Sequence, residues 1–170
     1  MAFVVWPVLM LVLHGVIPRM VSLHTVRHGW AEGRPGIWNA GGLLMVVVGG
    51  VLLMWTLVAH VEKIPERVRI ELEPPWEFTP PYLVASGPYV FTRNPMYVAI
   101  LALWLGWALF YGSAGVMVVC LILVIGINLA ARREERALEA RFGDAYRRYK
   151  AAVPRWLGTK RARTGSAPMP

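Results

Sequence analysis

The chain has 170 residues, of which 56% are hydrophobic and 16% charged, with a mean hydropathy of +0.48 and a net charge of +8. This composition excludes an ordinary soluble domain and indicates a membrane protein. The positive charge is not a sign of nucleic-acid binding, because 11 of the 18 Lys and Arg residues lie from Arg132 onward, where a basic segment beside a membrane span explains them.

Residues 1–60 are predicted to contain two membrane spans. The first apolar stretch, residues 2–18, is just long enough to cross, and it lacks the basic start and the cleavage site of a signal peptide. We interpret it as a retained span. A polar loop, residues 19–36, separates it from the second span, residues 37–60, whose glycine pairs at 41–42 and 49–50 would let a neighbouring helix approach closely.

A polar segment, residues 61–94, follows the second span. Five prolines between residues 65 and 81 prevent a long helix there. The segment is predicted to be a connector at the membrane surface, with a short amphipathic piece that carries Trp76.

The most informative feature is a block of 38 residues without a charge, between Arg93 and Arg132. A straight helix of that length would measure roughly 57 Å, about twice the hydrocarbon thickness of a bilayer. The block must therefore fold back, and the small residues at 112–115 mark the bend. Two spans, residues 95–111 and 116–131, then return both polar edges of the block to the same membrane face.

Four crossings place both termini on one side of the membrane. Residues 61–95 contain 4 Lys and Arg residues and the chain after residue 131 contains 11, against 3 in the loop 19–36, so the connector and tail are predicted to be cytoplasmic. Residues 132–157 show helical spacing of apolar side chains and are predicted to form an amphipathic helix at the interface, followed by a disordered tail, 158–170. The expected fold is an all-α integral membrane protein with about four transmembrane helices, in a bacterial inner membrane.

The first polar edge, Arg93-Asn94-Pro95, has two interpretations. Asn94 and Pro95 are typical of a helix start, in which the asparagine side chain caps the helix. The same helix end also presents free N–H groups and a partial positive charge, to which Arg93 adds a full one, so it could instead bind an anionic group such as a carboxylate.

The second polar edge places Glu134 and Glu135 among three arginines, where they could be a solvated interfacial pair. Adjacent helical residues point about 100° apart, so the two carboxylates cannot do the same job. One can face inward, where a ligand that carries a cation and hydroxyl groups would use it.

Several short motifs follow one another in a fixed order along residues 82–156, with a membrane hairpin between them: GPY at 87–89, RNPMY at 93–97, EE at 134–135, FG at 142–143 and VPRW at 153–156. This pattern resembles the isoprenylcysteine carboxyl methyltransferase family and its phospholipid methyltransferase relatives. The resemblance implies an integral membrane methyltransferase that uses S-adenosylmethionine, releases S-adenosylhomocysteine and needs no metal. It also implies that the acceptor enters sideways from the lipid.

The resemblance also implies site residues. The cofactor would lie at the cytoplasmic end of the last two spans, in contact with Tyr89, Arg93, Asn94, Met96, Tyr97, Glu134 and Glu135. Of these, Arg93, Asn94, Glu134 and Glu135 are the predicted catalytic residues. Better known members have histidine where this chain has Asn94 and glycine where it has Ala99, and an asparagine cannot transfer a proton by titrating.

Methyl transfer is an in-line displacement, so alignment and exclusion of water can supply much of the acceleration. The methyl acceptor stays open between two chemical classes. A carboxylate on a prenylated thiol compound is already ionised and would need only a cation such as Arg133 or Arg136 to place it. An amine on a phospholipid would need a base, and the sequence offers no obvious buried one. Asn128, one helical turn before Arg132, is a further candidate for the acceptor pocket.

Two other classes of function compete with an enzyme. A small transporter would use His14 and Asn128, the polar residues inside spans, although an interhelical hydrogen bond is the simpler interpretation of both. A non-catalytic scaffold would use the charged edges to bind membrane lipids. His24 and His28 have the spacing of metal ligands but lack a convincing acidic partner. The single cysteine, Cys120, excludes an intramolecular disulfide. The oligomeric state is not readable from the sequence.

Overall fold

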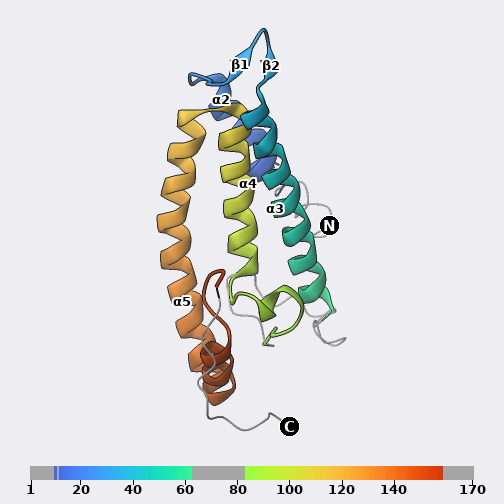
Figure 1. Ribbon diagram of the computed structural model, residues 1–170. Coiled ribbons are helices and arrows are strands. Elements are labelled where there is room, and N and C mark those ends of the chain that lie inside the picture. Colours follow the sequence, from blue (N-terminus) through green and yellow to red (C-terminus); the bar gives the residue numbers. More distant parts are fainter. Residues whose placement is uncertain (1–9, 11, 63–82, 159–170) are drawn as a thin grey trace.

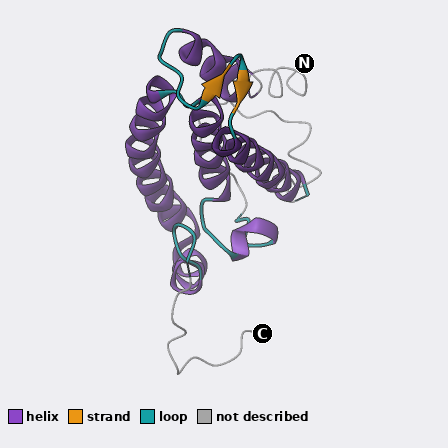
Figure 2. Ribbon diagram, turned by 45° about the horizontal axis from the view of Figure 1, so that its top comes forward, coloured by secondary structure: helices purple, strands orange, loops and turns teal. Residues whose placement is uncertain are grey.

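The computed structural model describes residues 10, 12–62 and 83–158. Three helices lie side by side along most of the molecule, with α4 between the other two (Figure 1): α3 (Ile37–Val61), α4 (Pro95–Tyr111) and α5 (Ala114–Ala152). Shorter elements gather at one end of these helices (Figure 2): a π-helical turn (Val12–Val16), α2 (Ile17–Leu23) and an antiparallel hairpin of β1 (Trp30–Ala31) and β2 (Arg34–Pro35). A short 3₁₀ helix, η2 (Gly87–Val90), precedes α4 at the other end.

Two of the described helices, α3 and α5, are long and apolar enough to cross a membrane. The 25 residues of α3 measure roughly 37 Å, more than the hydrocarbon thickness of a bilayer. The predicted third span has the predicted bounds, but with 17 residues α4 is shorter than these two. The predicted first span lies mostly outside the described residues, as do Trp76 and most of the predicted connector and tail.

The loop predicted at residues 19–36 is shorter than expected and contains regular structure. Helix α2 continues to Leu23, because Pro18 lies in its first turn, where a missing N–H breaks no helical hydrogen bond. The hairpin of β1 and β2 occupies residues 30–35. His24 and His28 are exposed, and the described part of the chain holds no group of three or more His, Cys, Asp or Glu residues that could bind a metal ion.

The predicted bend between the two last helices is confirmed. Gly112 ends α4 with a φ of 57°, a left-handed conformation that favours glycine, and its carbonyl accepts a hydrogen bond from the His28 N–H at 2.9 Å. Ser113 begins α5, and its hydroxyl accepts from the Val116 N–H at 3.2 Å. The uncharged block therefore forms a helical hairpin.

Helix α3 packs closely against α4 through glycines. The predicted close approach is confirmed for one glycine of each pair. A side chain at Gly42 would overlap the backbone of Gly106 and Phe110 in α4, and one at Gly49 would press on the backbone of α4 near Ala99. Gly41 and Gly50 face open space instead. Two helices can come this close only where one lacks a side chain.

His14 makes a contact within the helix bundle. The indole N–H of Trp104 donates to His14 Nδ1 at 3.0 Å, and the indole N–H of Trp107 donates to the His14 carbonyl at 2.6 Å. These bonds join the N-terminal turn to α4. The interhelical hydrogen bond, one of the two interpretations of His14 offered by the sequence, is the one that the structure contains.

The structure contains no break between the predicted fourth span, residues 116–131, and the helix predicted from residue 132. The end of the membrane span at residue 131 stays a prediction. Helix α5 runs on through the charged residues, because Arg, Glu, Ala and Leu are all good helix formers. The interruption comes later, at Gly143, with a φ of 52° and a ψ of −123°. After Val153 the chain turns back toward the start of α4 (Figure 1), and we call residues 153–158 the C-terminal strap.

Candidate active site at the open end of the helical hairpin

The two polar edges of the uncharged block meet at the end of the hairpin opposite the Gly112 bend. The Arg93 Nη2 atom lies 3.3 Å from Glu135 Oε1. One turn further into the hairpin, the Tyr97 hydroxyl donates to Glu134 Oε2 at 3.1 Å. The prediction that folding back would bring both edges together is confirmed.

Glu135 is the centre of a buried charged network. Its side chain is 4% exposed and interacts through both oxygens. Arg155 donates from Nε to Oε1 at 2.9 Å and from Nη2 to Oε2 at 2.7 Å, a two-atom pairing that is the strongest geometry for arginine and carboxylate. Asn94 Nδ2 adds a longer contact to Oε1 at 3.4 Å. We call Arg93, Glu135 and Arg155 the buried triad.

The partners of Glu135 decide its charge. Burial acts to raise the pKa of its carboxyl group, but the hydrogen bonds from Arg155 and the charges of Arg93 and Arg155 outweigh burial, so the pKa is lowered. Glu135 is therefore ionised at neutral pH. The triad then has two positive charges and one negative charge.

Arg93 is the less satisfied of the two arginines. Its side chain is 6% exposed, yet it has a single contact with Glu135, and its Nη1 reaches the Lys150 carbonyl only at 3.5 Å. Its Nε atom is buried and has no hydrogen-bond partner among the described residues. Buried polar groups normally find partners, so this N–H marks a place where a ligand could accept a hydrogen bond.

The C-terminal strap is fixed to the segment before α4. The Thr92 hydroxyl donates to the Arg155 carbonyl at 2.8 Å, and Asn94 Nδ2 donates to the same oxygen at 3.1 Å. The Arg93 N–H donates to the Pro154 carbonyl at 2.9 Å. Asn94 stands at the N-cap position of α4, but its side chain makes no capping hydrogen bond. Of the two interpretations of this edge, the structure does not contain the side-chain cap, because the Asn94 amide donates to Glu135 and to the strap instead.

Glu134 has a different environment from its neighbour, as the geometry of a helix predicts. It is half-buried, and among the described residues it accepts a hydrogen bond from the Tyr97 hydroxyl alone. Burial raises the pKa of its carboxyl group, and the charge of Glu135 adds to this, although the hydrogen bond from Tyr97 acts in the opposite direction. The two acids are thus electrostatically distinct.

The remaining predicted cofactor residues lie around this network. Tyr89 accepts a hydrogen bond on its carbonyl from the Tyr149 hydroxyl at 2.9 Å, and its own hydroxyl lies 3.3 Å from His60 Nδ1 at the end of α3. Met96 packs on the α3 side of α4, against the cluster of Leu53, Ala99 and Leu103. Their predicted contact with a cofactor stays a prediction.

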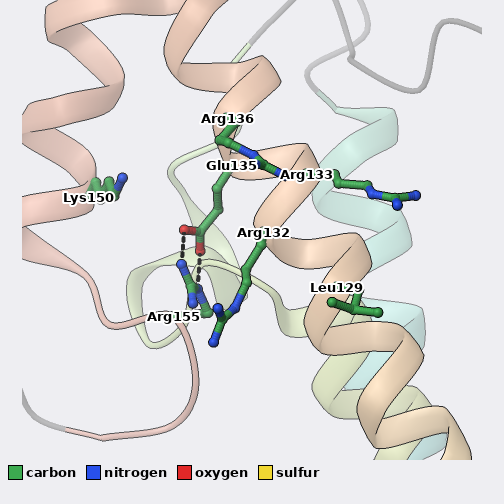
Figure 3. Close-up of a pocket in the computed structure, with 7 residues that line it drawn as sticks. All are labelled: Leu129, Arg132, Arg133, Glu135, Arg136, Lys150 and Arg155. Atoms are coloured by element: carbon green, nitrogen blue, oxygen red, sulfur yellow. Dashed lines mark hydrogen bonds and ion pairs between the residues drawn. The ribbon is translucent and has the colours of Figure 1, made fainter.

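A cavity of about 460 Å³ opens beside Glu135, between α5 and the strap (Figure 3). Seven of the described residues line it: Leu129, Arg132, Arg133, Glu135, Arg136, Lys150 and Arg155. Arg133 and Arg136, predicted to place the acceptor, are among them, whereas Asn128 is not. Arg132 extends toward Arg155, and Arg133 points away from the Glu135–Arg155 pair (Figure 3).

Sequence reasoning missed several members of this site: Thr92, Arg132, Lys150 and Arg155. Arg155 carried a usable signal, because it follows a proline directly after a helical pattern, and such a proline ends a helix and turns the chain. The direction of that turn, which brings Arg155 to Glu135, is a tertiary feature.

Comparison with known proteins identifies the family of the chain. Residues 38–145 match the phospholipid methyltransferase family. The chain belongs to this family. The match begins earlier than the motifs at 82–156 indicated, so this membrane methyltransferase shares α3 as well as the hairpin with its family. Arg93, Glu134 and Glu135 lie inside the match, and the strap lies beyond it.

Among individual relatives of this phospholipid methyltransferase family member, an uncharacterized protein of Haemophilus influenzae is 43% identical over 63 residues. These residues are 36% of this chain and the whole of the relative. No solved structure shows a significant match.

Proposed function

We propose that this member of the phospholipid methyltransferase family transfers a methyl group from S-adenosylmethionine to a carboxylate on a lipophilic acceptor. One observation carries the proposal: the buried triad has one positive charge in excess, and the half-buried Glu134 lies beside it. Burying an uncompensated charge is costly unless a partner arrives. A ligand with a carboxylate and an ammonium group complements such a pair of sites.

The residues present fit the amino-acid end of S-adenosylmethionine. Arg93 offers the buried Nε–H that no described residue accepts from, and a carboxylate would accept it. Glu134 has a single recorded donor among the described residues and would accept from the ammonium group. When bound, the cofactor supplies an electrophilic methyl group on its sulfonium.

The other residues of the site would position the reacting groups and exclude water from them. Glu135 and Asn94 hold the arginines and the strap, and neither needs to change protonation state. The strap is hydrogen-bonded to the segment before α4 and reaches Glu135 through Arg155, a position from which it would exclude water from the reacting groups. Alignment of this kind can be worth effective molarities of roughly 10⁵ to 10⁸ M in favourable cases. Contact of Tyr89, Met96 and Tyr97 with the adenosine part remains part of the proposal.

The cavity supports an anionic acceptor. Arg132, Arg133 and Arg136 line it and are exposed, and no carboxylate of the described residues forms an ion pair with any of them. Glu135, which also lines it, is already neutralised by arginines. Such a cavity attracts a carboxylate and repels an ammonium group. Leu129, in the uncharged part of α5, adds an apolar wall to the cavity, against which a lipid chain would lie.

The alternative acceptor is a phospholipid amine, in line with the name of the family. The observation that favours it is His60, which is half-buried and within 3.3 Å of the Tyr89 hydroxyl. An imidazole there could accept the proton that an ammonium group must lose before methylation. In either case we place the site on the cytoplasmic face of a bacterial inner membrane, from the positions of the basic residues.

Binding of S-adenosylmethionine to the detergent-solubilised protein tests the proposal. Arg93→Ala leaves the Glu135–Arg155 pair balanced, so the protein should fold but bind the cofactor at least about tenfold more weakly. Glu134→Gln should weaken binding similarly, and Arg148→Gln, an exposed site on the same helix, should not. A native protein that binds no S-adenosylmethionine would favour a transporter or a scaffold over an enzyme.

A further inference from the structure

We infer that Arg155 is a positioning residue, which holds the carboxylate of Glu135 so that the charge of Arg93 stays available to the carboxylate of the cofactor. The inference rests on the proposed function and assigns a task to a residue outside the family match. It concerns a side chain on the C-terminal strap, 20 residues away from Glu135 in the sequence.

The division of contacts between the two arginines supports this assignment. Arg155 contacts both oxygens of Glu135, at 2.9 Å and 2.7 Å. Arg93 has one longer contact, at 3.3 Å, and retains a buried Nε without a partner among the described residues. A carboxylate interacts most strongly with the arginine that grips it with two atoms. Glu135 is therefore mainly the partner of Arg155, and Arg93 is left incompletely neutralised.

The backbone of the strap does not depend on the Arg155 side chain. The Thr92 hydroxyl and Asn94 Nδ2 both donate to the Arg155 carbonyl, and the Arg93 N–H donates to the Pro154 carbonyl. The side chain itself is 30% exposed, so its replacement leaves no large buried void. A substitution of Arg155 can thus remove the charge while the strap keeps its hydrogen bonds.

The net charge of the buried triad falls in one variant and is restored in a second. In the native triad, Arg93 and Arg155 share one carboxylate, and one positive charge is left over. In Arg155→Gln, Arg93 and Glu135 balance each other, and an incoming carboxylate meets a neutral pair. In the Glu135→Gln/Arg155→Gln double variant, Arg93 is again unpaired. Adding Glu135→Gln to Arg155→Gln should therefore restore the affinity for S-adenosylmethionine that Arg155→Gln alone removes.

The experiment measures the dissociation constant of S-adenosylmethionine for the full-length protein in detergent, with size-exclusion chromatography to confirm folding. Arg155→Gln should bind at least about tenfold more weakly than the native protein, and Arg155→Lys, which keeps the charge but not the two-atom grip, should lie between them. The double variant should return to within about threefold of native affinity. Arg148→Gln should bind as the native protein does.

A matched ligand separates charge from structure. Decarboxylated S-adenosylmethionine lacks the group that Arg93 is expected to bind, so native protein and Arg155→Gln should bind it equally. The inference is overturned if Arg155→Gln binds S-adenosylmethionine like the native protein, or if the double variant is as weak as the single one, which would indicate a purely structural side chain. A native protein without affinity for S-adenosylmethionine would instead refute the proposed function itself.

Discussion

Replacement of Glu135 by glutamine provides the most direct test of the buried triad. The substitution keeps the size of the side chain and removes its charge. Arg155 is 30% exposed and can turn its charge toward water, but the Arg93 side chain is 6% exposed and cannot. Arg93 would then be a buried cation without a counter-charge.

Removing one partner of a buried ion pair costs about 3–5 kcal/mol, because the remaining charge stays desolvated. For a domain of this size each kcal/mol corresponds to about 2–4 °C in the unfolding temperature, so Glu135→Gln should lower it by roughly 6–20 °C. A surface ion pair is worth far less.

The assay is thermal unfolding in detergent, followed by tryptophan fluorescence, with Glu139→Gln as the matched control. Glu139 pairs with Arg147 and Lys150 at the surface of the same helix, so its replacement should leave the unfolding temperature unchanged. Equal effects of the two substitutions would refute the reasoning, because they would mean that burial does not distinguish the two acids.

Three further predictions concern Glu135, Gly143 and Tyr97. Because the folded-state pKa of Glu135 is lowered, the stability that its charge contributes is complete above about pH 4.3 and is lost as the pH falls through the lowered pKa. Unfolding temperatures are measured from about pH 6 to 3 in two proteins that both carry Glu134→Gln. The protein that keeps Glu135 should lose more of its unfolding temperature over this range than the one that also carries Glu135→Gln. Gly143→Ala forces alanine into a φ of 52° and a ψ of −123°, so chemical unfolding should show a loss of about 1–3 kcal/mol of stability. The control Gly126→Ala lies at an open helical position and should not destabilise the protein. Tyr97→Phe removes the hydrogen bond to Glu134 and should weaken cofactor binding about tenfold in the same titration, and an unchanged affinity would show that Tyr97 does not position Glu134 for the cofactor.

The hairpin was predictable because membrane thickness limits the length of a span. An uncharged block twice too long must fold back, and Gly112 is where the backbone allows it. Pro95 fixed the start of α4 in the same way, since proline fits the first helical turn. These local signals also placed Arg93 and Glu135 at the same end of the hairpin.

The interior of the site was not predictable to the same degree. A change from apolar to charged residues at 131/132 looks like a boundary, but it does not stop a helix whose residues all favour helical structure. A side-chain cap on α4 was one of two interpretations of Asn94, but its amide binds Glu135 and the strap, because tertiary partners outweigh a local preference. Arg155 depends on a reversal of the chain whose direction no local pattern specifies.

Transfer of a labelled methyl group into lipid tests the central claim most directly. The protein is reconstituted with bacterial lipid extract and S-adenosylmethionine labelled in its methyl group, and the organic phase is then extracted. The account predicts label in the lipid fraction that mild base releases, as from a methyl ester, and its loss in Arg93→Ala. Label that resists base would contradict the carboxylate acceptor, and the absence of both label and cofactor binding would contradict the enzyme.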